Sequence, residues 1–190
     1  ISNITNMNHF TGIYRDDLKI MEERIGKLKF QTSTNRRKLL SVPESLGGSM
    51  LWGSTFRQHP AHYKQRQPDP DCPGKNMTKL KEEEIDLKEY FHQFRNLYFK
   101  DFEFNSVHVN KNYATPPHFD SKNCGESVLV AMGDYRGGET CLYNSTSKKI
   151  EKYDARTKPL IFNGSEILHW VVPWTKGDRY TLVFFNSNRT

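Results

Sequence analysis

The sequence predicts a mainly β (α+β) chain whose core is a sandwich or barrel of the jelly-roll type, supported by helices in the N-terminal half. Two patterns lead to this fold class. After Asp101 the chain consists of short alternating segments separated by turn signals, whereas before it apolar residues recur at helical spacing. An aromatic fraction of 13%, with 12 Phe and 9 Tyr, is typical of β-rich cores. The length of 190 residues suits one domain with a sizeable core.

The N-terminal half predicts two helices joined by a loop. A first helix is expected over residues 14–28, where four apolar residues recur at helical spacing: Leu18, Met21, Ile25 and Leu28. Residues 41–77 are rich in proline and glycine, which indicates a loop. A second helix is expected over 78–99, because three glutamates suit its first turn and an apolar stripe follows. Residues 1–100 would therefore form a helical and loop support packed on a core of residues 101–190, as one structural domain.

Short strands follow one another in the C-terminal half. They are expected near 104–112, 126–132, 138–143, 149–154, 159–163, 167–172 and 179–186. Turn signals such as Pro116-Pro117, Gly133-Asp134 and Asn163-Gly164 separate them. Even spacing of short strands indicates a sandwich or a barrel, and cupin-like jelly rolls belong to this group.

Two histidines and one aspartate form a candidate metal site. His118 and Asp120 stand at positions i and i+2, and His169 follows 51 residues after the first. An i, i+2 pair points to one face on an extended strand, which a helix cannot provide. Two His and one Asp leave open positions on the opposite face of an Fe(II) ion, as in non-haem iron oxygenases. The alternatives are a core histidine beside Trp170 and a turn carboxylate after Pro116-Pro117.

These residues lie in a longer pattern that resembles a known superfamily. Residues 105–187 are similar to the double-stranded β-helix (jelly-roll, cupin-like) core of the Fe(II)/2-oxoglutarate-dependent dioxygenases. Within that superfamily, His118-Phe119-Asp120-Ser121-Lys122-Asn123 resembles the H-x-D-x-x-N of the TET and base-J thymidine hydroxylase branch. Residues 133–139 (GDYRGGE) and 177–185 (GDRYTLVFF) resemble the same branch.

The resemblance implies specific cofactor contacts. The two His and the Asp would hold Fe(II), leaving places for O2 and two oxygens of 2-oxoglutarate. Arg179 would bind the far carboxylate of this cosubstrate, because a guanidinium stays charged when buried and matches a carboxylate with two hydrogen bonds. The alternation that follows should turn Arg179 inward together with Thr181 and Val183. Further contacts to the cosubstrate are expected from Asn110, Asn112, Tyr113 and Asn123. A turn-forming role for Asn123 is the alternative.

The activity that the resemblance implies is hydroxylation or demethylation of a substrate, with release of succinate and CO2 and with ascorbate as a reductant. A methylated pyrimidine base in nucleic acid is the first expected substrate. The alternatives are a protein side chain or small metabolite as substrate, and a cupin-like binding protein without catalysis.

Charge and composition bear on partners and location. A formal net charge of +6 favours DNA or RNA as a partner, and basic stretches with interleaved aromatics occur in the N-terminal half. They comprise Arg36, Arg37 and Lys38, followed by His59, His62, Tyr63, Lys64 and Arg66. A solvated loop is the alternative. Three cysteines without zinc spacing, and no apolar run of membrane-spanning length, predict an intracellular protein, nuclear or cytoplasmic, that does not bind membranes.

Overall fold

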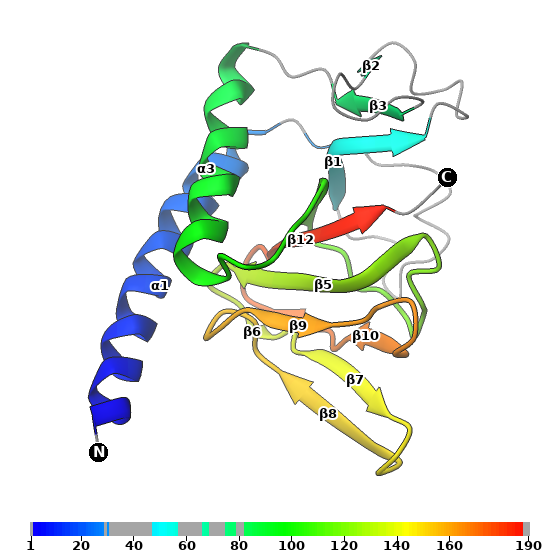
Figure 1. Cartoon of the computed structure of the whole chain (residues 1–190). Helices are drawn as coiled ribbons and strands as arrows, with labels where there is room; N and C mark the ends of the chain where they lie inside the picture. Colours follow the sequence, from blue (N-terminus) through cyan, green and yellow to red (C-terminus); the bar gives the residue numbers. More distant parts are fainter. Residues whose placement is uncertain are drawn as a thin grey trace.

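The computed structural model describes residues 2–28, 30, 47–56, 66–68, 75–78 and 82–187. Two helices, α1 (Ser2–Gly26) and α3 (Glu82–Tyr98), lie together on one side of a set of antiparallel sheets (Figure 1). No helix among these residues is long and apolar enough to cross a membrane.

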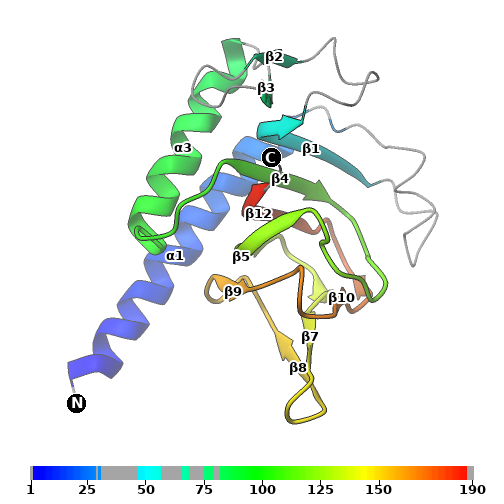
Figure 2. The same cartoon turned by 45° about the vertical axis from the view of Figure 1, so that its right-hand side comes forward.

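Three antiparallel sheets are built from twelve strands in the described part of the chain. The strands are β1 (Gly48–Phe56), β2 (Arg66–Pro68), β3 (Lys75–Thr78), β4 (Ser106–Lys111), β5 (Asn123–Met132), β6 (Arg136–Gly137), β7 (Thr140–Asn144), β8 (Lys149–Tyr153), β9 (Leu160–Phe162), β10 (His169–Val171), β11 (Trp174–Thr175) and β12 (Tyr180–Ser187). The large sheet has the order β2-β3-β1-β4-β12-β5-β9, the second has the order β10-β7-β8, and β11 pairs with β6. The architecture is therefore mainly β with two supporting helices, and the sheets form a jelly-roll core of the cupin type (Figure 2).

Side-chain alternation separates the two faces of the large sheet. In β12, Leu182 and Phe184 join the core shared with the helices, whereas Val183 packs into a second core against the smaller sheet. In β5, Val130 faces the helices and Ala131 faces the second core. Because neighbouring residues of a strand point to opposite faces, the inner face carries the odd-numbered residues of these two strands. The candidate site lies on this inner side.

Both helices pack on the large sheet through apolar stripes. The α1 stripe consists of Tyr14, Leu18, Met21 and Ile25, all buried. α3 adds Phe91 and Phe94 to the same core, and its bounds fall inside the predicted 78–99. α1 begins at Ser2, twelve residues before the predicted start. The missed part is rich in Asn and Thr, which are weak helix formers.

The prediction of a loop over residues 41–77 was wrong for the part that the structure describes. β1, β2 and β3 lie in this range and extend the large sheet beyond β4. Residues 48–53 of β1 pair with β4, and residues 54–56 pair with β3, so the strand changes partner after Gly53. Gly53 has φ 113°, and a Cβ there would lie 2.1 Å from the Asn105 carbonyl oxygen. Only glycine permits this close passage, so Gly53 enables the strand to switch partners.

The remaining strands agree with the predicted order. The strand predicted over 138–143 corresponds to β7, and β6, which precedes it, was not predicted; Gly137 and Gly138, both with positive φ, lie between the start of β6 and the start of β7. β11 was not predicted, and its two residues pair only with the equally short β6.

Candidate metal centre and anion pocket

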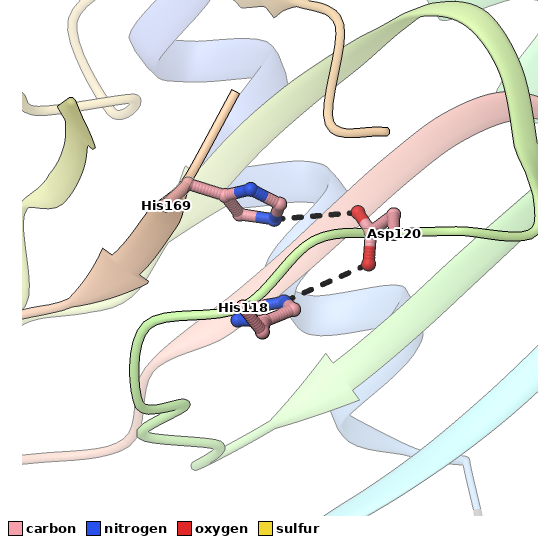
Figure 3. A group of neighbouring side chains, drawn as sticks. All are labelled: His118, Asp120 and His169. Carbon is pink, nitrogen blue, oxygen red and sulfur yellow. Dashed lines mark ion pairs between the residues drawn. The ribbon is translucent and has the colours of Figure 1, made fainter. Parts of the chain in front are cut away.

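His118, Asp120 and His169 come together at one end of the jelly roll. One ligand atom from each lies within 4.8 Å of the others (Figure 3). Asp120 lies between the two rings: its Oδ1 is 3.6 Å from His118 Nε2, and its Oδ2 is 3.3 Å from His169 Nε2. The three predicted ligands therefore converge through two imidazole nitrogens and one carboxylate.

Backbone pairing brings the two histidines into register. His118 and His169 form an antiparallel bridge, in which each amide donates to the other carbonyl at 3.0 and 3.2 Å. The Asp120 amide donates to the Gly164 carbonyl at 2.8 Å, just before the turn that precedes β5. The strand prediction for residues 118–120 holds only for this single bridge, since the residues on either side of His118 are not in a strand. The register of the bridge, rather than a long strand, positions the ligands.

The tautomer of each imidazole is set by a backbone acceptor. His118 Nδ1 lies 2.8 Å from the Pro116 carbonyl oxygen, and His169 Nδ1 lies 2.8 Å from the Ile167 carbonyl oxygen. A carbonyl accepts only, so Nδ1 carries a proton and Nε2 is the ring nitrogen that faces Asp120, where it donates to the carboxylate when protonated and offers a lone pair to a metal when not. Such outer hydrogen bonds are typical of metal-ligating histidines.

Neighbouring groups favour the charged form of the Asp120 carboxylate. Burial by itself raises the pKa of Asp120, but the hydrogen bond and charge of His169, followed by the charges of His118 and His108, outweigh it and lower that pKa. The side chains of Asp120 and His118 are each 34% exposed, whereas that of His169 is 7% exposed. The Asp120 carboxylate is thus charged at neutral pH, and the centre is open to solvent on the side of His118 and Asp120.

Arg179 lies buried at the start of β12, facing inward as alternation predicts. Its Nε donates to the Gly138 carbonyl at 3.0 Å, and its guanidinium carbon lies 5.8 and 5.5 Å from the ring centroids of Tyr135 and Trp174. Burial lowers the pKa of Arg179. Among the described residues no carboxylate forms an ion pair with it, although buried guanidinium groups ordinarily have such a partner. This part of the interior can therefore accept an anion.

One strand connects the anion pocket with the metal centre. Gly138, which accepts from Arg179, lies just before β7, and Leu142 of β7 pairs with His169. Thr140 lies between them on the same side of the strand. Arg179 and the ligands therefore belong to one continuous inner surface.

The other residues predicted to contact the cosubstrate lie at different places around this inner surface. The Asn110 amide donates to Thr181 Oγ1 at 3.3 Å on the inner face of the large sheet. Asn112 has φ 54° and directs both its amide atoms to the start of β12: Oδ1 accepts from the Arg179 amide, and Nδ2 donates to Asp178 Oδ1. Tyr113 is buried. The Asn112 side chain thus fixes the backbone of Arg179, and its contact with a cosubstrate stays a prediction.

Asn123 opens β5, and its side chain follows its own strand. Its Nδ2 lies 3.4 Å from Ser127 Oγ, and its backbone amide donates to the Asp120 carbonyl at 3.0 Å. This backbone contact closes a turn, as the alternative reading of Asn123 expects. The basic stretches over 36–38 and 59–64 lie outside the described residues, and of Arg66 only the backbone, in β2, is described.

Sequence reasoning missed several residues of the site. A Cβ at Gly164 would lie 2.8 Å from Asp120 Oδ2 and 3.3 Å from His169 Cε1, so glycine is needed beside the ligands. Phe162 packs its ring against His169 with a centroid distance of 4.9 Å. Tyr135 and Trp174 flank Arg179. Among the motifs found in the sequence, only Gly137-Gly138-Glu139 lies close to any of these residues, because their contacts depend on the packing of distant segments.

The jelly roll and its inward site define a class: the chain has the fold of the Fe(II)/2-oxoglutarate oxygenases, as the sequence resemblance implied. It is similar to an oxidoreductase of the 2OG-Fe(II) oxygenase family from Burkholderia pseudomallei, with a TM-score of 0.55 and 14% identity over 88% of this chain and 76% of that one. It is similar to NgTET1 in complex with 5mC DNA, with a TM-score of 0.50 and 14% identity over 95% and 68% of the two chains. A bsmA homolog from Methylobium petroleophilum gives a TM-score of 0.51 and 13% identity over 96% and 85%. No protein-family model and no curated protein matches the chain, and at these identities the structural likeness concerns the fold alone.

Proposed function

We propose that the protein is an Fe(II)- and 2-oxoglutarate-dependent dioxygenase that hydroxylates or demethylates a methylated pyrimidine base in nucleic acid. One observation carries the proposal. Two imidazole Nε2 atoms and a carboxylate converge in a jelly roll whose interior also holds a buried arginine that has no carboxylate partner among the residues that the structure describes. The first group suits a divalent metal, and the second suits a dicarboxylate.

The donor set fits a metal ion. Ligands that share an edge of an octahedron, each about 2.1 Å from the ion, lie about 3 Å apart. The 3.6 and 3.3 Å separations end on different oxygens of Asp120, and one ligand atom from each residue lies within 4.8 Å of the others, so the three side chains would move together by up to about 2 Å to share one ion. Both Nε2 atoms already face the carboxylate while each Nδ1 is held by a backbone carbonyl, so metal binding would displace at most a proton from Nε2. His118, Asp120 and His169 would hold Fe(II), which with O2 oxidises 2-oxoglutarate to succinate and CO2 and hydroxylates a C–H bond.

The interior also fits the cosubstrate. Arg179 would bind the far carboxylate of 2-oxoglutarate, which would supply the missing counter-charge. Asn110 offers a second contact, because its Oδ1 is buried and has no hydrogen-bond partner among the described residues. A 180° turn of the side-chain amide exchanges the positions of its oxygen and nitrogen. With oxygen and nitrogen exchanged, Thr181 would donate to Oδ1, and Nδ2 would point inward as a donor for a carboxylate.

Three observations support nucleic acid as the substrate. The chain carries a formal net charge of +6, its H-x-D-x-x-N run resembles that of the TET and base-J branch, and it shares a fold with NgTET1, whose structure contains 5mC DNA. A base inside a duplex cannot reach an enclosed metal, so the target base would be flipped out or unpaired. His118 and Asp120, the more exposed ligands, mark the side from which it would enter.

Turnover with defined substrates tests the proposal. The protein is incubated with Fe(II), 2-oxoglutarate, ascorbate and O2, with duplex or single-stranded DNA or RNA, methylated or unmethylated. Succinate is quantified and nucleosides are analysed by mass spectrometry. Hydroxymethylpyrimidine formed only from the methylated substrates is the expected result. Background succinate and unchanged nucleosides with every nucleic acid would refute the substrate assignment.

The same incubation separates the alternatives. Modification of peptide or metabolite pools, with nucleic acid unchanged, would support a 2-oxoglutarate-dependent hydroxylase of a protein side chain or small molecule. A cupin-like binding protein without catalysis predicts no 2-oxoglutarate consumption with any substrate pool. The buried Arg179 favours an enzyme over this last alternative, because a purely structural metal centre does not require an anion pocket.

A further inference from the structure

The geometry points to Tyr135 and Arg156 as positioning residues for Arg179: Arg156 holds the Tyr135 ring, and the ring in turn sets the guanidinium in the anion pocket. The inference rests on the proposed function, since Arg179 is there the anchor of 2-oxoglutarate. It concerns affinity for the cosubstrate, not the chemistry at the metal.

Arg179 has few constraints of its own. Within the described part of the chain, Nε of Arg179 donates to the Gly138 carbonyl, and no carboxylate there forms an ion pair with the guanidinium. The flanking aromatic groups therefore define where the guanidinium lies. A cation near an aromatic ring is attracted to it, and more strongly where water is excluded. Tyr135 is 4% exposed, so its contact with Arg179 is a desolvated one.

Arg156 fixes the Tyr135 ring and its loop. Its guanidinium carbon lies 4.0 Å from the ring centroid. The same group donates to the carbonyls of Gly133 and Tyr135 at 3.3 and 2.7 Å, and it is bound through Nε and a terminal nitrogen by the Asp154 carboxylate. One side chain thus ties the loop after β5 to the turn after β8. Burial first of all raises the pKa of Tyr135, while the charges of Arg179 and Arg156, and to a smaller extent a polar contact of the Tyr135 hydroxyl with Arg179, act to lower it, so both guanidinium groups lie near this side chain.

Gly138 makes the contact between ring and guanidinium possible. A Cβ at this position would lie 2.7 Å from a carbon of the Tyr135 ring and 3.1 Å from Arg179 Cδ. Gly138 also has φ 71°, which glycine adopts without strain. The chain therefore passes here with no side chain, and the arginine and the aromatic ring meet.

Arg156 has no place in the anion pocket itself. It lines a separate open cavity of about 430 Å³ between α1 and the end of β5, together with Arg15, Lys19 and Asp134. Its side chain is 28% exposed and already paired with Asp154. An effect of Arg156 on cosubstrate affinity would therefore be transmitted through Tyr135.

Calorimetric titration of 2-oxoglutarate into the Mn(II)-loaded protein tests the inference, with KM and kcat measured in parallel. Tyr135→Leu removes the ring, Tyr135→Phe keeps it, and Arg156→Met removes the group that holds it. Loss of one cation–π contact is expected to weaken cosubstrate binding about 2- to 30-fold. We expect this loss for Tyr135→Leu and Arg156→Met, and an affinity near that of the wild type for Tyr135→Phe. In both weakened variants the Mn(II) affinity should be unchanged, and the KM for 2-oxoglutarate should rise while kcat at saturating 2-oxoglutarate is retained.

Arg95→Met is the matched control. Arg95 also lies over an aromatic ring, that of Phe104, at 5.8 Å, and also donates to backbone carbonyls, but it projects from α3. Its substitution should leave 2-oxoglutarate affinity unchanged. Tyr135 is buried, so Tyr135→Leu can fail to fold. Arg156 is partly exposed, so Arg156→Met tests the inference independently. Wild-type affinity in Arg156→Met would overturn the inference, and so would equal losses in Tyr135→Phe and Tyr135→Leu, which would assign the contact to the hydroxyl. No binding of 2-oxoglutarate to the wild type would instead overturn the proposed function, and the inference with it.

Discussion

Gly164→Ala is expected to weaken metal binding without unfolding the protein. The added Cβ would lie 2.8 Å from Asp120 Oδ2, whereas ordinary contact begins near 3.4 Å, so the oxygen must move by about 0.6 Å. The atom that moves is the end of a side chain that can rotate, so the backbone stays in place. It is also a proposed ligand atom, 3.3 Å from His169 Nε2. Displacements of about 0.5 Å already spoil a metal site, and changes beside ligands typically cost about 10- to 100-fold in affinity.

The assay is calorimetric titration of Mn(II) into the metal-free protein, with Fe(II) under anaerobic conditions as a second titrant. We expect a Kd about 10- to 100-fold higher for Gly164→Ala, and a Tm within about 2 °C of wild type in chelator. Gly26→Ala is the matched control, since a Cβ there meets only the Tyr180 hydroxyl at an ordinary 3.7 Å. Wild-type Mn(II) affinity in Gly164→Ala would refute the reasoning that the glycine makes room for the carboxylate.

Other predictions concern the ligands, the anion pocket, the substrate and a salt bridge. Alanine at His118, Asp120 or His169 should abolish succinate production with circular dichroism unchanged, and turnover near wild type in any of them contradicts the triad. Arg179→Ala should weaken 2-oxoglutarate binding by about 2–5 kcal/mol in calorimetry and leave the Mn(II) affinity unchanged. If the variant binds 2-oxoglutarate as tightly as the wild type, Arg179 does not bind this cosubstrate. Binding to nucleic acid, followed by fluorescence anisotropy, should weaken steeply with salt, because neutralised phosphates release counterions; a flat salt dependence argues for another substrate. Burial raises the pKa of Asp154, but the hydrogen bonds that its carboxylate accepts from Arg156 outweigh burial and lower that pKa. The charged Asp154–Arg156 pair therefore stabilises the folded protein fully above the unfolded-state pKa of Asp154, and this contribution is lost as pH falls through the folded-state pKa. Asp154→Asn should therefore lower Tm at pH 7 and not below that folded-state value, and a pH-independent difference contradicts the assignment.

Local pattern carried much of the prediction. The i, i+2 spacing and the distant histidine identified three residues that the structure brings within ligand distance of one another. Alternation after Arg179 placed it on the inner face with Thr181 and Val183, and the buried Arg179 and Thr181 and the packing of Val183 confirm this orientation. These signals are readable because side-chain direction along a strand follows from sequence position alone.

The features that were missed depend on contacts between distant segments. β1 was hidden by the glycines and prolines around it, because nothing local shows that Gly53 allows a switch of strand partner. Gly164 and Tyr135 have roles defined by Asp120 and Arg179, which no spacing rule connects to them. The left-handed backbone of Asn112 directs its side-chain amide to residues 178 and 179, a role that the sequence pattern did not show, and its contact with a cosubstrate stays a prediction.

The backbone bridge between His118 and His169 has a thermodynamic consequence. His169 belongs to the small sheet, and His118 to the segment that leads from the large sheet back into β5, so the bridge joins two parts of the barrel wall. An ion held by both residues would act as a cross-link between these parts. At a free metal concentration one hundred times the Kd, such binding stabilises the folded state by about 2.7 kcal/mol. This stabilisation would resist local opening at the mouth of the barrel, where the bridge is one pair of hydrogen bonds long. Metal loading would then determine whether that end of the protein stays closed, in addition to supplying its chemistry.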